Sequence, residues 1–311
     1  LSNIVYSQNN VNWNMCMDVA SSAFSNLHPR VVLNGSDEPV VLWGNSSVNR
    51  VIISHMSSGS FTTPIWINTS NFPAFAASWA GPDLAAKGDT IYAVFKMTPE
   101  TNNHTYITKS IDGGTSFNTP VVVDNIADSI SRFPTVAIDQ NGNPVVAYMK
   151  FNSSFMDSRW VVSKSYDGGQ TFAADVKASG WSGGTICDCC PGSIIMYGNN
   201  CLVTYRDNLN NIRDTWTSIS TNGGQSFSNG WNVDGNNWFL TSCPSMGPDA
   251  VIIGDTLFAV FASSASVSPK CYLSKSLIST QSLLSVSDLS VGLNGVSQQN
   301  FPRISSCILG N

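Results

Sequence analysis

The sequence predicts an all-β fold, a β-propeller whose blades are four-stranded antiparallel sheets. Three observations lead to this prediction: a turn motif that recurs along the chain, a proline that recurs in step with it, and short β-rich runs that alternate with turn residues. Helical periodicity is absent. A repeated unit of roughly 50 residues with four strands is typical of a propeller blade.

The recurring turn has the pattern Ser-x-Asp/Asn-Gly-Gly-x-Ser/Thr-Phe. Asp or Asn before glycine suits a tight turn, because the side chain bonds nearby backbone N–H groups and glycine takes positive φ without strain. The serine adds a local hydrogen bond, and the phenylalanine can be buried between sheets. We therefore interpret the motif as a structural turn. Its key positions are Ser110, Asp112, Gly114 and Phe117; Ser165, Asp167, Gly169 and Phe172; and Ser220, Asn222, Gly224 and Phe227.

Two weaker copies, residues 54–61 and 276–283, extend the series. The first serines then stand at positions 54, 110, 165, 220 and 276, so the spacings are 56, 55, 55 and 56 residues. Such a regular spacing indicates that one unit is repeated along the chain.

A proline precedes the expected first strand of each unit, where its missing N–H falls outside the ladder. These prolines are Pro29, Pro82, Pro134, Pro191, Pro248 and Pro302. A second strand, a loop, a third strand, the recurring turn and a fourth strand follow in each unit. The clearest second strands are expected at Val145–Met149, Leu202–Tyr205 and Leu257–Phe261, and the clearest third strands at Trp160–Ser163 and Trp216–Ile219.

Composition excludes several classes of partner. Charged residues make up 11% of the chain and the net charge is −5, which argues against nucleic acid. No stretch approaches ~18 uninterrupted apolar residues, so no membrane span is expected. No Gly-rich phosphate loop leads from a strand into a helix, so no nucleotide or other cofactor is expected. Eight cysteines and few lysines favour an oxidising compartment outside the cytoplasm; a cytosolic protein with buried thiols is the alternative.

The pattern Ser-x-Asp-x-Gly-x-Ser/Thr-Phe resembles the Asp-box, or bacterial neuraminidase repeat, of the sialidase superfamily. The segment Cys187-Asp188-Cys189-Cys190-Pro191 resembles secreted bacterial proteins described as sialidase-like. In that superfamily the Asp-boxes lie on the face opposite the active site. The resemblance also implies a propeller of six blades, with the last blade incomplete in this chain.

This interpretation divides the chain into an N-terminal segment, 1–26, and a propeller, 27–311. Within the first segment Asn3–Ser7 is a candidate ring-closing strand. Blades are expected at about 27–78, 79–130, 131–180, 181–240 and 241–297, and the start of a sixth at 298–311. Either the chain is part of a longer exported polypeptide, for example one with a C-terminal sorting domain, or five blades close the ring.

The functional face should lie opposite the recurring turns, where the segments before first strands meet the loops between second and third strands. Its ligand-binding candidates are Arg30, Arg132, Arg206, Asp207, Arg213, Asp214, Trp181, Trp238 and Arg303, with His28, Trp79, Asp83 and Asp249 at similar positions. The arginines either bind a ligand carboxylate, which suits the guanidinium fork, or pair with Asp207, Asp214 and Asp249 to order the loops.

The resemblance implies that a sialidase needs an arginine cluster, a tyrosine nucleophile activated by Glu, and an Asp acid/base. Only Glu38 and Glu100 are present; Glu38 is expected on the wrong face and Glu100 in a loop of the second blade. No catalytic residue is therefore assigned. We expect a secreted or cell-surface module that binds glycan or protein; the alternatives are an exo-sialidase-type glycoside hydrolase and a structural domain of a larger protein.

The cysteines offer a second feature. Cys190 and Cys243 both precede first strands of adjacent blades, so a Cys190–Cys243 disulfide is expected, and Cys271 with Cys307 could form another. A metal site is the alternative, because soft sulfur ligands select Cu(I) or similar ions. Its ligands would come from Cys189, Cys190, Cys243 and Met246, with Met15, Cys16 or Met17 as further candidates.

Overall fold

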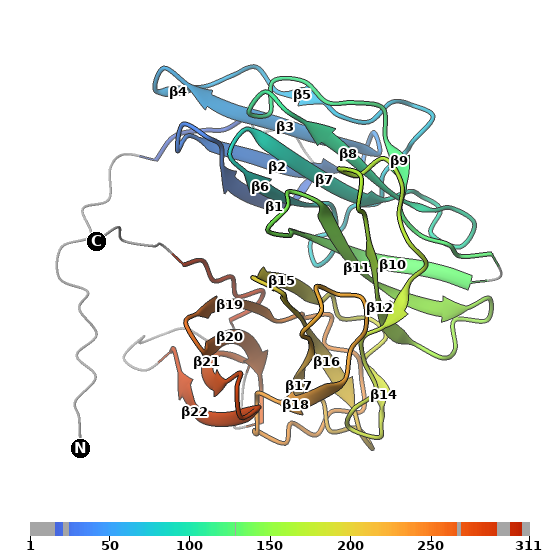
Figure 1. Ribbon diagram of the computed structural model, residues 1–311, viewed down its shortest axis with the longest axis vertical. Helices are drawn as coiled ribbons and strands as arrows, with labels where there is room; N and C mark the ends of the chain where they lie inside the picture. Colours follow the sequence, from blue (N-terminus) through green and yellow to red (C-terminus); the bar gives the residue numbers. More distant parts are fainter. Residues whose placement is uncertain (1–15, 21–24, 128, 266–268, 291–298, 307–311) are drawn as a thin grey trace.

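The computed structural model describes residues 16–20, 25–127, 129–265, 269–290 and 299–306. All regular structure in these ranges is β: five antiparallel sheets follow one another along the chain (Figure 1). No described helix is long and apolar enough to cross a membrane. The prediction of an all-β protein made of four-stranded antiparallel units is confirmed.

Each sheet is formed by consecutive strands. The first contains β1 (Asn26–Leu33), β2 (Pro39–Asn45), β3 (Arg50–Ser57), β4 (Ser60–Phe61) and β5 (Ile65–Trp66). The second contains β6 (Asp83–Lys87), β7 (Thr90–Lys96), β8 (Thr105–Ser110) and β9 (Val121–Val122). The third contains β10 (Ser129–Ile138), β11 (Pro144–Asn152), β12 (Arg159–Lys164) and β13 (Val176–Lys177). The fourth contains β14 (Thr185–Ile186), β15 (Ser193–Tyr197), β16 (Asn200–Asn208), β17 (Thr215–Ser220) and β18 (Asn229–Asn232). The fifth contains β19 (Asp249–Ile253), β20 (Thr256–Ser263), β21 (Lys270–Leu277) and β22 (Ser282–Asp288).

The first long strand of every sheet lies at the centre of the molecule. A cavity of 530 Å³ is lined by residues of β1, β6, β10, β15 and β19. Neighbouring inner strands also pack against each other, β1 on β6, β6 on β10, β10 on β15 and β15 on β19. Five sheets are thus arranged in an arc around one central cavity (Figure 1), as blades are arranged in a propeller.

The prolines mark the start of inner strands in two different ways. Pro82 and Pro248 stand directly before β6 and β19, as expected. In β1 and β10 the ladder begins earlier, and the register shifts where the proline stands, between Leu27 and Arg30 in β1. Proline is compatible with such a bulge because the bulged residue needs no partner in the ladder.

The residue before three of these prolines has positive φ. The values are 57° at His28, 54° at Phe133 and 54° at Phe301. Large side chains rarely adopt this conformation, so its recurrence is a feature of the repeat. This geometry thus precedes three of the six prolines, Pro29, Pro134 and Pro302.

The described residues nevertheless form no strand after Pro302. The segment 299–306 instead lies along the fifth sheet, where the Ile304 N–H donates to Asp249 Oδ2 at 3.2 Å. The strand expected at Arg303–Ile304 is thus absent from the described part of the chain, and the sixth blade stays a prediction. The candidate closing strand Asn3–Ser7 lies outside the described residues.

The recurring turns connect the third and fourth strands of their sheets. In the turn 165–172, Ser165 Oγ accepts a hydrogen bond from the Gly169 N–H at 2.8 Å, and Asp167 Oδ1 accepts one from the Thr171 N–H at 2.9 Å. Phe172 packs against a buried cluster between the second and third sheets. The turns 110–117 and 220–227 repeat the serine–glycine bond at 3.0 and 2.9 Å. The Asp167 carboxylate bonds the N–H groups three and four residues further along the chain.

The core consists of apolar layers between neighbouring sheets. Trp160 on β12 is fully buried between the third and fourth sheets, beside Val203 and Tyr205 of β16. Because each middle sheet is covered on both faces, its strands are buried along nearly their whole length instead of alternating, as β11 and β16 show.

Candidate functional site

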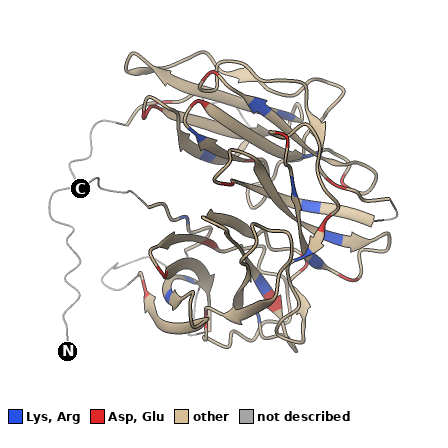
Figure 2. Cartoon of the chain, viewed as in Figure 1, with Lys and Arg blue, Asp and Glu red and all other residues tan. Residues whose placement is uncertain are grey.

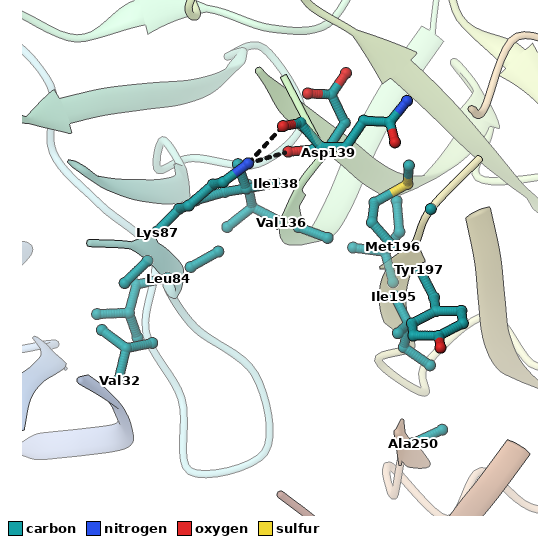
Figure 3. A pocket seen from close by; sticks show the side chains of 16 residues that line it. Val32, Leu84, Lys87, Val136, Ile138, Asp139, Ile195, Met196, Tyr197 and Ala250 are labelled. Carbon is teal, nitrogen blue, oxygen red and sulfur yellow. Dashed lines mark hydrogen bonds between the residues drawn. The ribbon is translucent and has the colours of Figure 1, made fainter. Parts of the chain in front are cut away.

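The central channel has two ends with different chemistry. Toward the recurring turns it is mainly apolar, lined by Val32, Leu84 and Val136 among others (Figure 3). Two charged side chains lie there, and both are engaged. Lys87 Nζ donates to the backbone oxygens of Asp139 and Gln140 at 3.4 and 2.6 Å, and Asp139 Oδ2 lies 3.0 Å from Lys164 Nζ. This end offers little for polar recognition.

The opposite end gathers four charged side chains in a cavity of 380 Å³. Arg30, Asp83, Asp249 and Arg303 line it together with apolar residues of the inner strands. Arg30 Nε lies 3.3 Å from Asp83 Oδ1, and Arg303 Nη1 lies 3.8 Å from Asp249 Oδ2. We call these four residues the mouth cluster. Charged residues are otherwise few and spread over all five sheets with both signs interspersed (Figure 2).

Neighbouring strands hold the two carboxylates of the mouth cluster. Asp83 Oδ2 accepts hydrogen bonds from Thr135 Oγ1 at 2.7 Å and from the Val136 N–H at 3.2 Å, both on β10. Asp249 accepts one from the Ala250 N–H at 3.0 Å. Burial raises the pKa of Asp249 to about 6, and the charge of Asp83 adds to the rise. Asp249 therefore changes its charge within the range of physiological pH.

The two arginines differ in how free they are. The Arg30 guanidinium donates to the Pro29 carbonyl at 2.9 Å and contacts the His28 ring, and its side chain is 15% exposed. Burial lowers the pKa of His28 to about 3, so the ring is neutral. The Arg303 side chain is 43% exposed, and within the described part of the chain its one charged partner is Asp249, at a long distance. Arg303 is thus the cation of the mouth cluster with the most capacity for a ligand.

Arg132 on strand β10 and Glu100 in the loop between β7 and β8 form a separate pair. Arg132 Nε donates to both Glu100 carboxylate oxygens at 3.1 Å, and Nη2 lies 3.0 Å from Oε2. The guanidinium also lies over the rings of Trp79 and Phe133, at 5.9 and 4.5 Å from their centroids. Glu100 is therefore held by an arginine that itself packs against aromatic rings, which agrees with the loop-ordering role that the sequence left open for the arginines.

Five candidates from the fourth repeat lie inside the protein instead of at the mouth. They are Arg206, Asp207, Arg213, Asp214 and Trp238, each at most 7% exposed. Arg206 donates to the carbonyl oxygens of Met246, Arg213 and Ala262, and its guanidinium lies 5.0 Å from the centroid of the Trp238 ring. Three of the five N–H groups of this guanidinium are bonded to carbonyl oxygens, and its complete burial keeps the rest out of reach of a ligand. We expected these five residues on the ligand-binding face, but the structure places them in the interior.

The buried acids around Arg206 have shifted protonation. Asp214 accepts hydrogen bonds from the Trp238 N–H at 3.0 Å and from Asn232 Nδ2 at 2.8 Å. Burial raises the pKa of Asp207 to about 6 and that of Asp234 to about 7. The sequence did not identify Asp234 as a candidate, because an Asp in an Asn/Gly-rich loop is typical of a turn. Trp181 is half-buried and packs closely on Gly230.

The disulfide differs from the expected one by a single residue. Cys189, not Cys190, is bonded to Cys243, and Cys190 is a free, buried thiol. Cys190 Sγ lies 3.2 Å from Cys187 Sγ, which also accepts a hydrogen bond from Arg213 Nη1 at 3.1 Å. The hydrogen bond from Cys190 and the Arg213 charge lower the pKa of Cys187. The signal missed in the sequence was the Cys-x-x-Cys spacing of Cys187 and Cys190.

The other sulfur-bearing candidates are Met246, Cys16, Met15 and the expected pair Cys271 and Cys307. The side chain of Met246 is buried with Trp238 and Ala262 in an apolar cluster. Cys16 is exposed. Met15 and Cys307 lie outside the described residues, so the pairing of Cys271 with Cys307 and a contribution from Met15 stay predictions.

Several solved structures share this architecture. A protein of unknown function from Dyadobacter fermentans superimposes with a TM-score of 0.58 and 13% identity, over 84% of this chain and 82% of that chain. A Hadza microbial sialidase gives 0.57 and 11% identity, over 86% of this chain and 59% of that chain. An α-L-arabinofuranosidase of Fusarium graminearum gives 0.55 and 12% identity, over 89% and 82%. The fold is a β-propeller. At these identities the likeness concerns the fold alone, and no protein-family model or curated protein matches the sequence.

Proposed function

We propose that the protein is an exported, sialidase-like propeller that acts as a glycan- or protein-binding module, with the carboxylate of an acidic sugar as its ligand group. The mouth cluster carries this proposal, because it places two guanidinium groups and two carboxylates in one cavity at the centre of the propeller. Ligands of propellers commonly enter at such a central opening, where loops from several blades converge.

The chemistry of the cluster favours an acidic sugar over a neutral one. The Arg303 fork can bind a carboxylate in two parallel hydrogen bonds, with Asp249 released from its long contact. Asp83 and Asp249 supply acceptors for sugar hydroxyl groups. The apolar side chains of Val31, Val136 and Ile194 in the cavity wall suit the carbon face of a pyranose ring.

Two further observations support the proposal. Similar folds are found in proteins named as a sialidase and an arabinofuranosidase. The Cys189–Cys243 disulfide supports export, since disulfides persist mainly in oxidising compartments.

The test compares an oligosaccharide that ends in sialic acid with the same oligosaccharide lacking that residue. We expect calorimetric titration at neutral pH to detect the first and not the second, and raised salt to weaken the binding. Equal affinity for both would contradict the carboxylate–arginine recognition, and no affinity for either would contradict a sialylated ligand.

An exo-sialidase-type hydrolase is the second candidate, favoured by the raised pKa of Asp249. A carboxyl group with a pKa of about 6 keeps its proton at mildly acidic pH and can donate it to a leaving group. A fluorogenic sialoside should then be turned over at mildly acidic pH, with the rate abolished by Asp249→Asn. Binding without turnover would leave the binding module as the function.

A further inference from the structure

We propose that the reduced protein binds one thiophilic metal ion through Cys187, Cys189, Cys190 and Cys243. One ligand atom from each of these residues lies within 4.8 Å of all the others. The Sγ atoms of Cys187 and Cys189 are 3.7 Å apart, and those of Cys189 and Cys190 are 4.0 Å apart. Four sulfurs about 2.3 Å from a central Zn²⁺ form a tetrahedron whose edges are about 3.8 Å.

The fold brings these sulfurs together from two loops. Cys187, Cys189 and Cys190 lie on the loop before β15, and Cys243 lies on the loop before β19. The first loop is fixed by the Cys187 N–H, which donates to the Arg206 carbonyl at 3.0 Å. The two loops are in direct contact, because a Cβ at Gly247 would stand 2.1 Å from the Pro191 oxygen. The site would therefore join the fourth sheet to the fifth.

The charges around the sulfurs form an independent argument. Arg206 and Arg213 are 0% and 7% exposed, and neither forms a salt bridge with a carboxylate in the described part of the chain. Buried charges are normally paired. Four thiolates around a divalent ion form a dianion, whose charge the two guanidinium groups would balance.

The groups next to the sulfurs are of the kind that hold metal ligands in place. Arg213 Nη1 donates to Cys187 Sγ, and the backbone of Met246 forms a hydrogen bond with Cys190. The Met246 carbonyl in turn accepts from Arg206 Nε at 3.1 Å. Hydrogen bonds of this type orient sulfur ligands and partly neutralise their charge.

The disulfide and the metal-bound form are alternative states of the same four residues. A phosphine reductant supplies two electrons to the Cys189–Cys243 bond, and two protons give the two thiols while the phosphine becomes its oxide with an oxygen atom from water. Binding of a divalent ion then releases four protons, one from each thiol. Because all four positions are filled by the protein, the ion would stabilise the joint between sheets and leave no open position for catalysis.

The test uses the full chain, reduced with a phosphine under nitrogen and titrated with Co²⁺ as a spectroscopic probe. We expect one Co²⁺ per chain, a strong sulfur-to-cobalt charge-transfer band, displacement by Zn²⁺, and no uptake by the unreduced protein. Cys187→Ser should weaken Co²⁺ binding at least about tenfold, while Cys271→Ser, a cysteine outside the cluster, should leave it unchanged.

A second measurement covers the case in which the Cys187→Ser variant does not fold. Zn²⁺ added to the reduced wild-type chain should protect the four cluster cysteines from alkylation, as mapped by mass spectrometry, and leave Cys271 reactive. Absence of a thiolate-type cobalt spectrum, protection at other cysteines, or a Cys189–Cys243 bond that resists reduction in the folded protein would each overturn the proposal.

Discussion

Replacing Arg206 by alanine should destabilise the fold strongly and should not act through a ligand. The guanidinium donates to three buried carbonyl oxygens, on Met246, Arg213 and Ala262. Each buried acceptor that loses its partner costs about 1–3 kcal/mol, so three of them set a range of about 3–9 kcal/mol. Part of this cost is offset, because the variant no longer buries a charged group away from water. We expect the free energy of unfolding to fall by about 3–5 kcal/mol.

Such a loss is a large fraction of the roughly 5–15 kcal/mol by which native domains are stable. Urea unfolding without reductant, followed by tryptophan fluorescence, measures it. Arg159→Ala is the matched control, because Arg159 pairs only with the exposed Asp157 and should cost less than about 1 kcal/mol. An Arg206→Ala protein as stable as this control, or one that loses glycan binding at full stability, would refute the structural role of Arg206.

Two further changes probe the buried acids and the recurring turns. Burial raises the pKa of Asp234 to about 7 from an unfolded value of about 3.9, so its stabilising contribution is complete below the lower value and is lost as pH rises through the higher one. The unfolding free energy of Asp234→Asn relative to wild type should therefore increase between about pH 4 and pH 8, and a difference independent of pH would show that Asp234 keeps an ordinary pKa. Ser165→Ala removes the acceptor of the Gly169 N–H and should lower the unfolding free energy by about 1–2 kcal/mol in urea melts. If it costs no more than the same change at the exposed Ser153, the serine does not hold the turn.

The sequence was most informative about the sheets, because turn chemistry and strand patterning are local. A Ser-x-Asp-Gly-Gly turn between two β-rich runs specifies a hairpin whatever surrounds it. The regular spacing of these turns then indicated one repeated β unit. The sequence did not predict the bulges in β1 and β10, because a proline at a strand start and a proline in a bulge have the same sequence pattern.

The functional residues were harder to place, because their roles depend on which sheet covers them. Arg206 and Arg303 were both expected on the functional face, yet Arg206 lies under the loop before β19 and Arg303 borders the cavity at the mouth. The disulfide shows the same limit at the scale of one residue. Adjacent side chains point in different directions, so Cys189 reaches Cys243 while Cys190 turns inward to Cys187.

The central claim is that ligands are recognised at the mouth cluster by an exposed arginine. Calorimetric titration of a sialylated oligosaccharide into the wild type and the Arg303→Ala variant tests it most directly, because Arg303 has little structural role. Loss of a charge-assisted contact worth about 1.5–3 kcal/mol predicts an affinity at least about tenfold lower, with unchanged urea stability. Equal affinity of the two proteins would show that recognition occurs elsewhere on the propeller.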